Sequence, residues 1–373
     1  MKLLLKQTLG FLLVLAMSTG PTQGAIRKDS FRSVEELRNW GLDNKEGSHI
    51  SARKAWRISK GKKQVVVAVI DTGIDPSHPE LRDNLWKKPG TADEYGFDFV
   101  TGRKNPLDTN NHGTHVAGII AAAARTGAGA SGVAPQVSIM AIRYYDDNAS
   151  GAVNLANTVK AINYAIDNGA DVINYSGGGP EFNASEMKAI QRAEQRGILF
   201  VAASGNDFHN TDETGNQFYP ASYGLPNIVS VAATNIHNGL ASFSNWGARS
   251  VHVAAPGERI YSTFSKGRFG YLTGTSQATA FVSGIAALML SEFPALKPAE
   301  IREMLMRSAD RLDALKGKVA SGGRVNAFAA LRTTLALRDT GADETLMAAL
   351  ADNSDTVRSR ENSGRANRKV AFK

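Results

Sequence analysis

Six consecutive apolar residues at positions 65–70, five of them β-branched, limit the fold of this chain more than any other feature. A run without a polar member is typical of a strand covered on both faces, and such strands belong to parallel sheets. The run ends at the turn Asp71-Thr72-Gly73, after which helical periodicity and strand-like runs alternate. Helical periodicity covers residues 112–124, 153–168, 184–195, 276–292 and 298–307, and strand-like runs cover residues 137–142, 171–174, 198–202 and 228–232. The alternation predicts an α/β fold: a doubly wound, mostly parallel sheet with helices on both faces.

The composition agrees with a folded protein and excludes cysteine chemistry. Apolar residues make up 42% and charged residues 21% of the 373 residues, close to the average of globular proteins. Because the chain has 0 Cys, it has no disulfide, no thiolate nucleophile and no Cys-ligated metal. Its stability therefore comes from a buried core, which a chain of this length can form.

The beginning of the chain is typical of an export signal. Lys2 and Lys6 precede an apolar run at residues 9–17, and small and polar residues follow as far as Gly24. This run is too short for a membrane-spanning helix, which needs about 20 apolar residues. We therefore expect residues 1–24 to be a signal peptide, the protein to be secreted to the periplasm or the medium, and no segment to insert into a membrane.

The net charge of +8 comes largely from the end of the chain. Residues 357–373 hold six Lys/Arg and one Glu. A basic adhesin or nucleic-acid binder would depend on this segment alone, because the rest of the chain has little excess charge. We expect no nucleic-acid partner.

Three polar side chains stand where a doubly wound sheet gathers its functional groups. Asp71 follows the first strand, His112 begins the helix of the motif His-Gly-Thr-His-Val-Ala-Gly, and Ser276 follows Gly-Thr at the start of another helix. The carboxyl ends of parallel strands and the adjoining helix starts meet at one edge of such a sheet. An attacking hydroxyl, an imidazole that takes its proton and a carboxylate that orients the imidazole are the parts of nucleophilic acyl transfer.

Two hydrogen-bond donors are expected beside the hydroxyl. The backbone N–H of Ser276 is an unpaired donor of a first helical turn, at the positive end of the helix dipole. Asn206, which follows the strand at residues 198–202, can aim its side-chain amide at the same oxygen. One such amide contributes about 3–4 kcal/mol of transition-state stabilisation in the best-studied enzyme of this kind.

With these motifs in the order Asp, His, Asn, Ser, the chain resembles the subtilisin family of serine endopeptidases. Residues 69–75, 112–118, 202–206 and 274–276 carry the resemblance. It implies a three-layer α/β fold, with Asp71 as orienting carboxylate, His112 as general acid and base, Ser276 as nucleophile, and an oxyanion hole formed by Asn206 and the Ser276 N–H. It also implies that the substrate peptide binds along Ser176, Gly177, Gly178, Ser204 and Gly205.

The resemblance extends over residues 49–337 and sets the expected domain limits. Residues 49–337 would form the catalytic domain, preceded by a short pro-segment or extension at residues 25–48. Residues 338–373 are a polar, basic tail that we expect to be disordered.

Two positions bear on substrate choice and point in opposite directions. Phe218 is expected at the floor of the pocket for the side chain that precedes the scissile bond, where it would favour small side chains. Asp207 is expected near the rim of the same pocket, where it would favour basic ones. The sequence leaves the side-chain preference open.

No cofactor is expected to be required for this chemistry, and no metal ligand is assigned. His112 and His115 have a spacing that fits zinc, but the sequence indicates no third ligand. Members of the subtilisin family often bind a structural calcium, for which the oxygen-bearing candidates here are Glu80, Asp98, Asp108 and Asn110. The segment has several Lys/Arg and no dense run of acidic side chains. A structural calcium is left open.

The expected function is that of a secreted serine endopeptidase, a monomer that acts on protein or peptide substrates through an acyl-enzyme. The alternative is a catalytically silent protein that binds peptides on the same fold. The presence of all four catalytic groups favours the enzyme.

Overall fold

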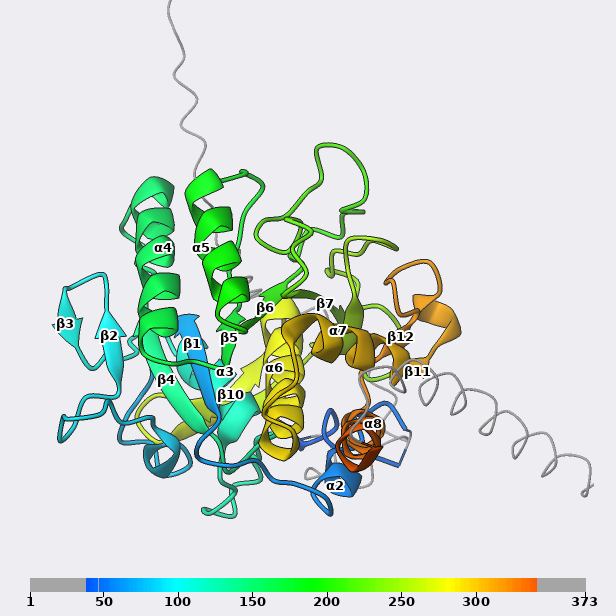
Figure 1. The fold of residues 1–373 in the computed structure, drawn as a ribbon, viewed down its shortest axis with the longest axis horizontal. Coiled ribbons are helices and arrows are strands. Elements are labelled where there is room, and N and C mark those ends of the chain that lie inside the picture. The colour runs from blue at the N-terminus through cyan, green and yellow to red at the C-terminus, as the bar shows by residue number, and fades with distance from the viewer. Residues whose placement is uncertain (1–37, 46, 341–373) are drawn as a thin grey trace, which may run out of the picture.

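The structure, a computed structural model, describes residues 38–45 and 47–340 (Figure 1). The expected signal peptide, most of the N-terminal extension and the basic tail lie outside the described residues, as does a short helix expected at residues 344–350. Within the described part of the chain, no helix combines the length and the apolar character needed to cross a membrane.

A ten-stranded sheet runs through the middle of the molecule. From one edge to the other its strands are β11 (Asp310–Arg311), β12 (Gly323–Arg324), β8 (Val253–Pro256), β7 (Ile228–Thr234), β6 (Leu199–Ala203), β5 (Val172–Tyr175), β1 (Val66–Asp71), β4 (Ser138–Arg143), β2 (Gly96–Asp98) and β3 (Arg103–Lys104). Neighbouring strands from β12 to β2 are parallel, and the edge strands β11 and β3 are antiparallel. The predicted fold class, a doubly wound and mostly parallel sheet, is confirmed. A separate hairpin pairs β9 (Ile260–Phe264) with β10 (Arg268–Leu272).

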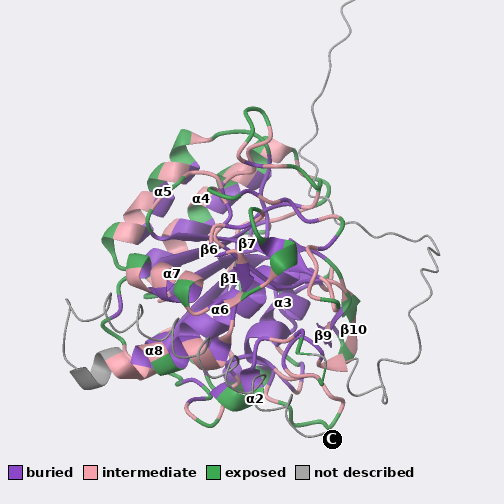
Figure 2. Cartoon of the chain, turned by 90° about the vertical axis from the view of Figure 1, so that its right-hand side faces the viewer, coloured by how far each residue is buried: buried purple, intermediate pink, exposed green. Residues whose placement is uncertain are grey.

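Helices cover both faces of the sheet and give the molecule three layers (Figures 1 and 2). On β1, Val67 and Val69 belong to the core under one helical layer, whereas Ala68 and Ile70 belong to the core under the other, because successive side chains of a strand point to opposite faces. The first layer contains α3 (His112–Ala121), α6 (Thr275–Glu292) and α7 (Pro298–Arg307), and the second contains α4 (Gly151–Asp167) and α5 (Ala184–Gln195). The remaining helices are α2 (Ala52–Ala55), α8 (Ala327–Thr340) and the short 3₁₀ turns η1 (Arg82–Asn84) and η2 (Asp313–Leu315).

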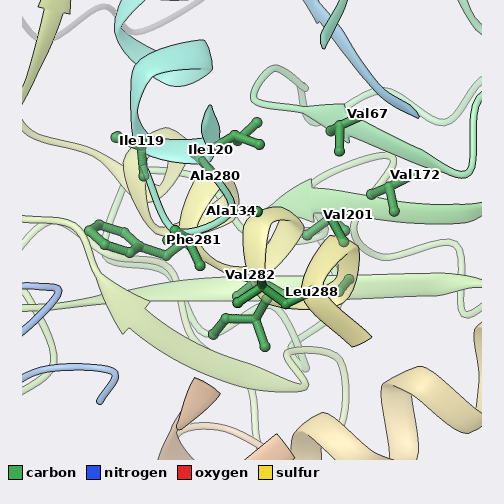
Figure 3. Close-up of a cluster of buried hydrophobic side chains, with 14 of the residues drawn as sticks. Val67, Ile119, Ile120, Ala134, Val172, Val201, Ala280, Phe281, Val282 and Leu288 are labelled. Atoms are coloured by element: carbon green, nitrogen blue, oxygen red, sulfur yellow. The ribbon is translucent and has the colours of Figure 1, made fainter. Parts of the chain in front are cut away.

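Helix α6, which carries the expected nucleophile, is buried along almost its whole length. Every residue of α6 except Glu292 is buried, and its side chains pack between the sheet and α3 (Figure 3). Figure 3 shows Val282 and Leu288 of α6 among side chains of the central strands, Val67, Val172 and Val201. A helix that is apolar all round has neighbours all round, and this packing fixes the position of its first turn.

The predicted bounds of helices agree with the structure where the apolar periodicity is strong. They differ where a contact with a distant residue ends the helix. Helices α5 and α7 have the predicted bounds. Helix α3 ends at Ala121, three residues earlier than predicted, because Ala123 donates its N–H to the Glu80 carbonyl and Ala124 takes a positive φ of 55°. Strand β8, the β9–β10 hairpin and α8 were not predicted.

Described structure continues beyond both expected limits of the catalytic domain. Trp40 and Leu42, which the expected limit assigns to the extension, are buried in the core that contains α6. At the other end, α8 continues to Thr340, three residues into the expected tail.

Candidate active site

Asp71 is the last residue of β1, and its carboxylate pairs with the ring of His112 at the start of α3. The distance from Asp71 Oδ1 to His112 Nδ1 is 2.7 Å, and the same oxygen accepts the backbone N–H of Thr72 at 2.8 Å. Gly113 permits this approach, because a Cβ there would lie 2.1 Å from the carbonyl oxygen of Gly73. Both Asp71 and His112 are buried. The contact leaves Nε2 of the ring for a second partner.

Opposing effects act on the pKa of His112. Burial lowers this pKa, whereas the charge of Asp71, its hydrogen bond and the charge of Asp108 raise it, and the net direction is upward. The pH at which the imidazole becomes neutral, and so able to accept a proton, is therefore higher than for a free histidine.

Asp108 organises the turn around this pair, a role that sequence analysis missed. Its Oδ2 accepts the backbone N–H of Thr114 at 2.9 Å and the Thr114 hydroxyl at 2.6 Å. Its Oδ1 accepts the Thr72 hydroxyl at 3.0 Å, and Thr72 Oγ1 in turn accepts the N–H of Gly113. The available signal was an acidic residue shortly before a predicted helix, where a carboxylate can satisfy first-turn N–H groups.

His115 is a structural residue of α3. It is fully buried, and its Nε2 lies 2.9 Å from the carbonyl oxygen of Ile260 on β9. Burial lowers the pKa of His115 to about 3, so the ring is neutral at physiological pH. Among the described residues, no group of three or more His, Asp or Glu side chains has the arrangement of a metal site.

Ser276 is the second residue of α6 and bonds to the segment that follows β5. Its hydroxyl donates to the carbonyl oxygen of Ser176 at 3.0 Å, and the Ser176 hydroxyl donates to the carbonyl oxygen of Ser276 at 3.2 Å. Asn174 Nδ2 donates to the Ser176 hydroxyl. Within the described chain, the hydroxyl of Ser276 is therefore bonded to Ser176 and not to His112. Catalytic hydrogen bonds often form only when substrate is bound.

The amide of Asn206 is oriented by the residue that begins α6. Asn206 Oδ1 accepts both the backbone N–H and the hydroxyl of Thr275, each at 2.9 Å. A Cβ on Gly274 would lie 3.6 Å from Asn206 Nδ2 and 3.7 Å from the backbone nitrogen of Ser276. The two N–H groups thus lie on the same side of Gly274, and the side-chain oxygen of Gln277 lies 3.0 Å from the same Cβ position.

The residues expected to bind peptide follow two neighbouring parallel strands, β5 and β6. Gly177 and Gly178 follow β5, and Gly205 follows β6 with a φ of +103°, a conformation that favours glycine. Ser204 is fully buried, and its hydroxyl donates to the carbonyl oxygen of Asn245. Any contact of Ser204 with a peptide would therefore come from its backbone. Asn245, whose supporting role was not predicted, also donates to the Ser204 carbonyl oxygen.

One aromatic ring lies between these two segments. A Cβ on Gly178 would lie 2.4 Å from Phe218 Cε1, and a Cβ on Gly205 would lie 3.0 Å from Phe218 Cδ2. Backbone hydrogen bonds in both directions between Gly179 and Tyr219, of 2.9 and 2.7 Å, hold the ring there. We call residues 218–223, with the glycines that they contact, the pocket wall.

The oxygens considered for calcium are already occupied by donors of the protein. The Glu80 carboxylate accepts the N–H groups of Arg125 and Thr126 and the Thr126 hydroxyl at 2.6–2.8 Å. Asp98 accepts the N–H groups of Val100 and Thr101 and is paired with Arg143. Asp108 is saturated as described above, which leaves Asn110 with a buried, unpaired Oδ1. Calcium takes six to eight oxygens, so these four side chains, three of them already bonded to protein donors, do not by themselves form a calcium site.

Comparisons with known proteins find a family model and several similar sequences. The family model described as "Subtilase family" matches residues 62–356. The "Thermophilic serine proteinase" of Bacillus sp. (strain AK1) is 40% identical over 277 residues, which cover 74% of this chain and 64% of that protein. "Thermitase" of Thermoactinomyces vulgaris is 38% identical over 284 residues, which cover 76% of this chain and 94% of that protein.

A solved structure titled as proteases from Pseudoalteromonas arctica has the same fold. The TM-score is 0.68 at 28% sequence identity, and the match covers 80% of this chain and 97% of that one. The chain thus spans just under two thirds of the Bacillus proteinase and nearly the whole of thermitase.

Proposed function

The chain belongs to the subtilase family, and we propose that it is an exported serine endopeptidase that hydrolyses peptide bonds through an acyl-enzyme. The observation that carries this proposal is the buried contact of 2.7 Å between Asp71 and His112 at the end of the sheet where Ser276 stands in the first turn of α6. The membership itself confirms the resemblance found in the sequence.

In the proposed reaction, the Ser276 hydroxyl breaks its hydrogen bond to the Ser176 carbonyl oxygen and turns toward His112. Its oxygen then attacks the carbonyl carbon of the scissile peptide bond. His112 Nε2 accepts the hydroxyl proton and delivers it to the departing amine, which breaks the C–N bond and leaves an ester on Ser276. A water molecule then attacks the ester carbonyl while His112 accepts its proton and delivers a proton to the Ser276 oxygen, which breaks the ester bond and releases the carboxylic acid product. Asp71 holds the ring by Nδ1 and stabilises the imidazolium.

The two N–H groups beside Gly274 serve this reaction as the oxyanion hole. As the carbonyl carbon becomes tetrahedral, its oxygen gains negative charge between Asn206 Nδ2 and the Ser276 N–H. The bonds from Thr275 fix the Asn206 amide in advance, so the donors need no reorganisation when charge develops. A donor of this kind contributes about 3–4 kcal/mol, a magnitude taken from subtilisin itself.

The pocket wall favours substrates with a small side chain before the scissile bond. The Phe218 ring fills the slot between the two glycine segments along which a peptide would lie. Asp207, the competing determinant, is exposed, and its backbone N–H is bonded to Asn245. The Phe218 ring excludes large substrate side chains by its volume. This effect outweighs the attraction of a basic side chain to Asp207, because water and salt screen an exposed charge.

The remaining parts of the proposal concern the setting of the enzyme. We propose that residues 1–24 direct export, that the enzyme acts as a monomer, and that catalysis requires no cofactor. N-terminal sequencing of the mature protein tests the first point, and a mature chain that still begins at Met1 would contradict it.

Hydrolysis of casein and of a peptide library tests the proposed activity. We expect cleavage by the wild type and its loss in Ser276→Ala. Ser308→Ala is the matched control, because the Ser308 hydroxyl is buried without a hydrogen-bond partner and lies at the end of α7. Peptide binding without cleavage in the folded wild type would favour the silent peptide-binding protein instead.

A further inference from the structure

Helix α5 carries a carboxyl group on the face that it buries. Glu186 is 3% exposed, and among the described residues no Lys, Arg or His forms an ion pair with it. A buried carboxylate without a cation is unfavourable, so such a group is retained only where its surroundings supply hydrogen bonds or where it is protonated. The proposed reaction does not use it.

The hydroxyl of Tyr223 has two acceptors for its one proton. Its oxygen lies 2.7 Å from Glu186 Oε2 and 3.0 Å from the carbonyl oxygen of Asn183, and it accepts the N–H of Asn183 at 3.2 Å. When Glu186 is ionised, the tyrosine proton goes to the carboxylate, which forms the stronger bond. When Glu186 is protonated, the carboxyl donates to the tyrosine oxygen and the tyrosine proton turns to Asn183.

The environment of Glu186 places this exchange near neutral pH. Burial raises the pKa of Glu186 to about 7, and the bond from Tyr223 lowers it only in part. The titratable groups that face it are Tyr223, from the pocket wall, and Tyr175, from β5; burial and the charge of Glu186 raise the pKa of both phenols. They stay neutral while Glu186 titrates.

Tyr223 connects this carboxyl to the pocket wall. Its ring lies 4.9 Å from the ring of Tyr219, and Phe182 packs edge-on against both rings at 5.5 and 5.6 Å. The backbone of Tyr219 forms the paired bonds with Gly179, and the preceding residue, Phe218, fills the slot. A change in how Tyr223 is held therefore reaches the peptide segment through directly packed groups.

We propose that Glu186 is a positioning residue of the peptide pocket, which through Tyr223 holds the pocket wall more firmly when ionised than when protonated. This inference depends on the proposed function only in that the pocket binds substrate. Peptide affinity then improves as the pH rises through the titration of Glu186, in addition to the effect of His112 on the rate.

Two measurements on the full-length mature protein test the proposal in the Ser276→Ala background, which binds peptide without cleaving it. The first is the infrared difference spectrum between pH 6 and pH 8. We expect the C=O band of a protonated carboxyl at pH 6, absent in Ser276→Ala/Glu186→Gln and retained in the matched control Ser276→Ala/Glu194→Gln on the same helix.

The second measurement is the Kd of an unlabelled Ala-rich peptide at pH 6 and pH 8. We expect Kd to fall about threefold between these values, because only part of the roughly five- to tenfold difference between a neutral and a charged hydrogen bond acts on the peptide segment. The fall should be lost with Glu186→Gln or Tyr223→Phe and kept with Glu194→Gln. An absent carboxyl band, or a Kd that changes equally in all variants, would overturn the proposal. Both measurements use the inactive Ser276→Ala background and do not depend on cleavage. Failure of the proposed activity would instead appear in the casein assay with the wild type.

Discussion

The catalytic edge, formed by Asp71, His112, Asn206 and Ser276, and the pocket wall differ in how they are built. On the catalytic edge each side chain stands at or beside the end of a regular element, and hydrogen bonds orient Asp71, His112 and Asn206, as in the 2.7 Å pair. In the pocket wall, the ring of Tyr223 packs on that of Tyr219, and the ring of Phe218 packs on glycines that lie more than ten positions earlier in the sequence. The first construction fixes the atoms that react, and the second shapes a volume. Changes to the catalytic edge should therefore alter the rate, and changes to the pocket wall should alter binding and choice.

The largest expected effect comes from the base. His112→Ala should lower kcat about a million-fold, as loss of this group does in subtilisin, and leave KM within a fewfold. Steady-state kinetics on a peptide p-nitroanilide measure both constants, with the exposed His237→Ala as control. A rise in KM with kcat unchanged within tenfold would contradict the claim that the catalytic edge sets the rate and the pocket wall sets binding.

The next effect concerns the oxyanion hole. Asn206→Ala should lower kcat by about 10²–10³ with little change in KM, because the amide bonds an oxygen that is charged only in the transition state. Thr275→Ala removes one of the two bonds to Asn206 Oδ1 and should cost about tenfold or less. An equal loss in both variants would show that the amide is not the acting group.

Phe218→Gly tests the pocket wall directly. Removal of the ring opens the slot, so the ratio of kcat/KM for a Phe substrate to that for an Ala substrate should rise about 10–100-fold. The exposed Tyr271→Ala on β10 serves as control, since this residue lies in the separate hairpin and not in the pocket wall. A ratio that stays constant while kcat falls would assign Phe218 to the catalytic edge instead.

Glu186→Gln should change how stability depends on pH. In the folded protein the pKa of Glu186 is raised from 4.5 to about 7, so the folded state holds this proton more tightly than the unfolded state. The resulting stabilisation is complete below pH 4.5 and is lost as the pH rises through 7. The loss by pH 8 is on the order of 3 kcal/mol.

Urea unfolding at pH 5 and pH 8, in the Ser276→Ala background to prevent self-digestion, measures this difference. The Gln variant should lose less stability between the two pH values than its parent. An equal loss in both proteins would mean that Glu186 does not titrate in this range.

The smallest expected effect is that of a chelator. Because protein N–H and O–H groups occupy Glu80, Asp98 and Asp108, EDTA should shift the Tm by less than about 1 °C. A large fall in Tm, reversed by calcium, would contradict this.

The two regions also differ in what their sequence reveals. The fold class and the sheet-edge position of Asp71, His112 and Ser276 followed from local patterns, because a buried strand and a helix start each have a signature within a few residues. The sequence did not decide whether Phe218 or Asp207 sets the side-chain preference. Only the fold shows that the Phe218 ring lies against both glycine segments.

The supporting groups escaped sequence analysis for a related reason. Asn245 bonds Ser204 across 41 positions, and Tyr223 bonds Glu186 across 37. No local pattern marks such pairs. Helix α3 was predicted too long because the contact that ends it comes from Glu80, far earlier in the chain.

Labelling with a fluorophosphonate, followed by mapping of the modified peptide by mass spectrometry, tests the central claim most directly. We predict one phosphonylated residue, Ser276, with labelling slowed by orders of magnitude in His112→Ala and unaffected in His237→Ala. A folded protein that resists the reagent, or that carries the label on another serine, would contradict the assignment of Ser276 as the nucleophile.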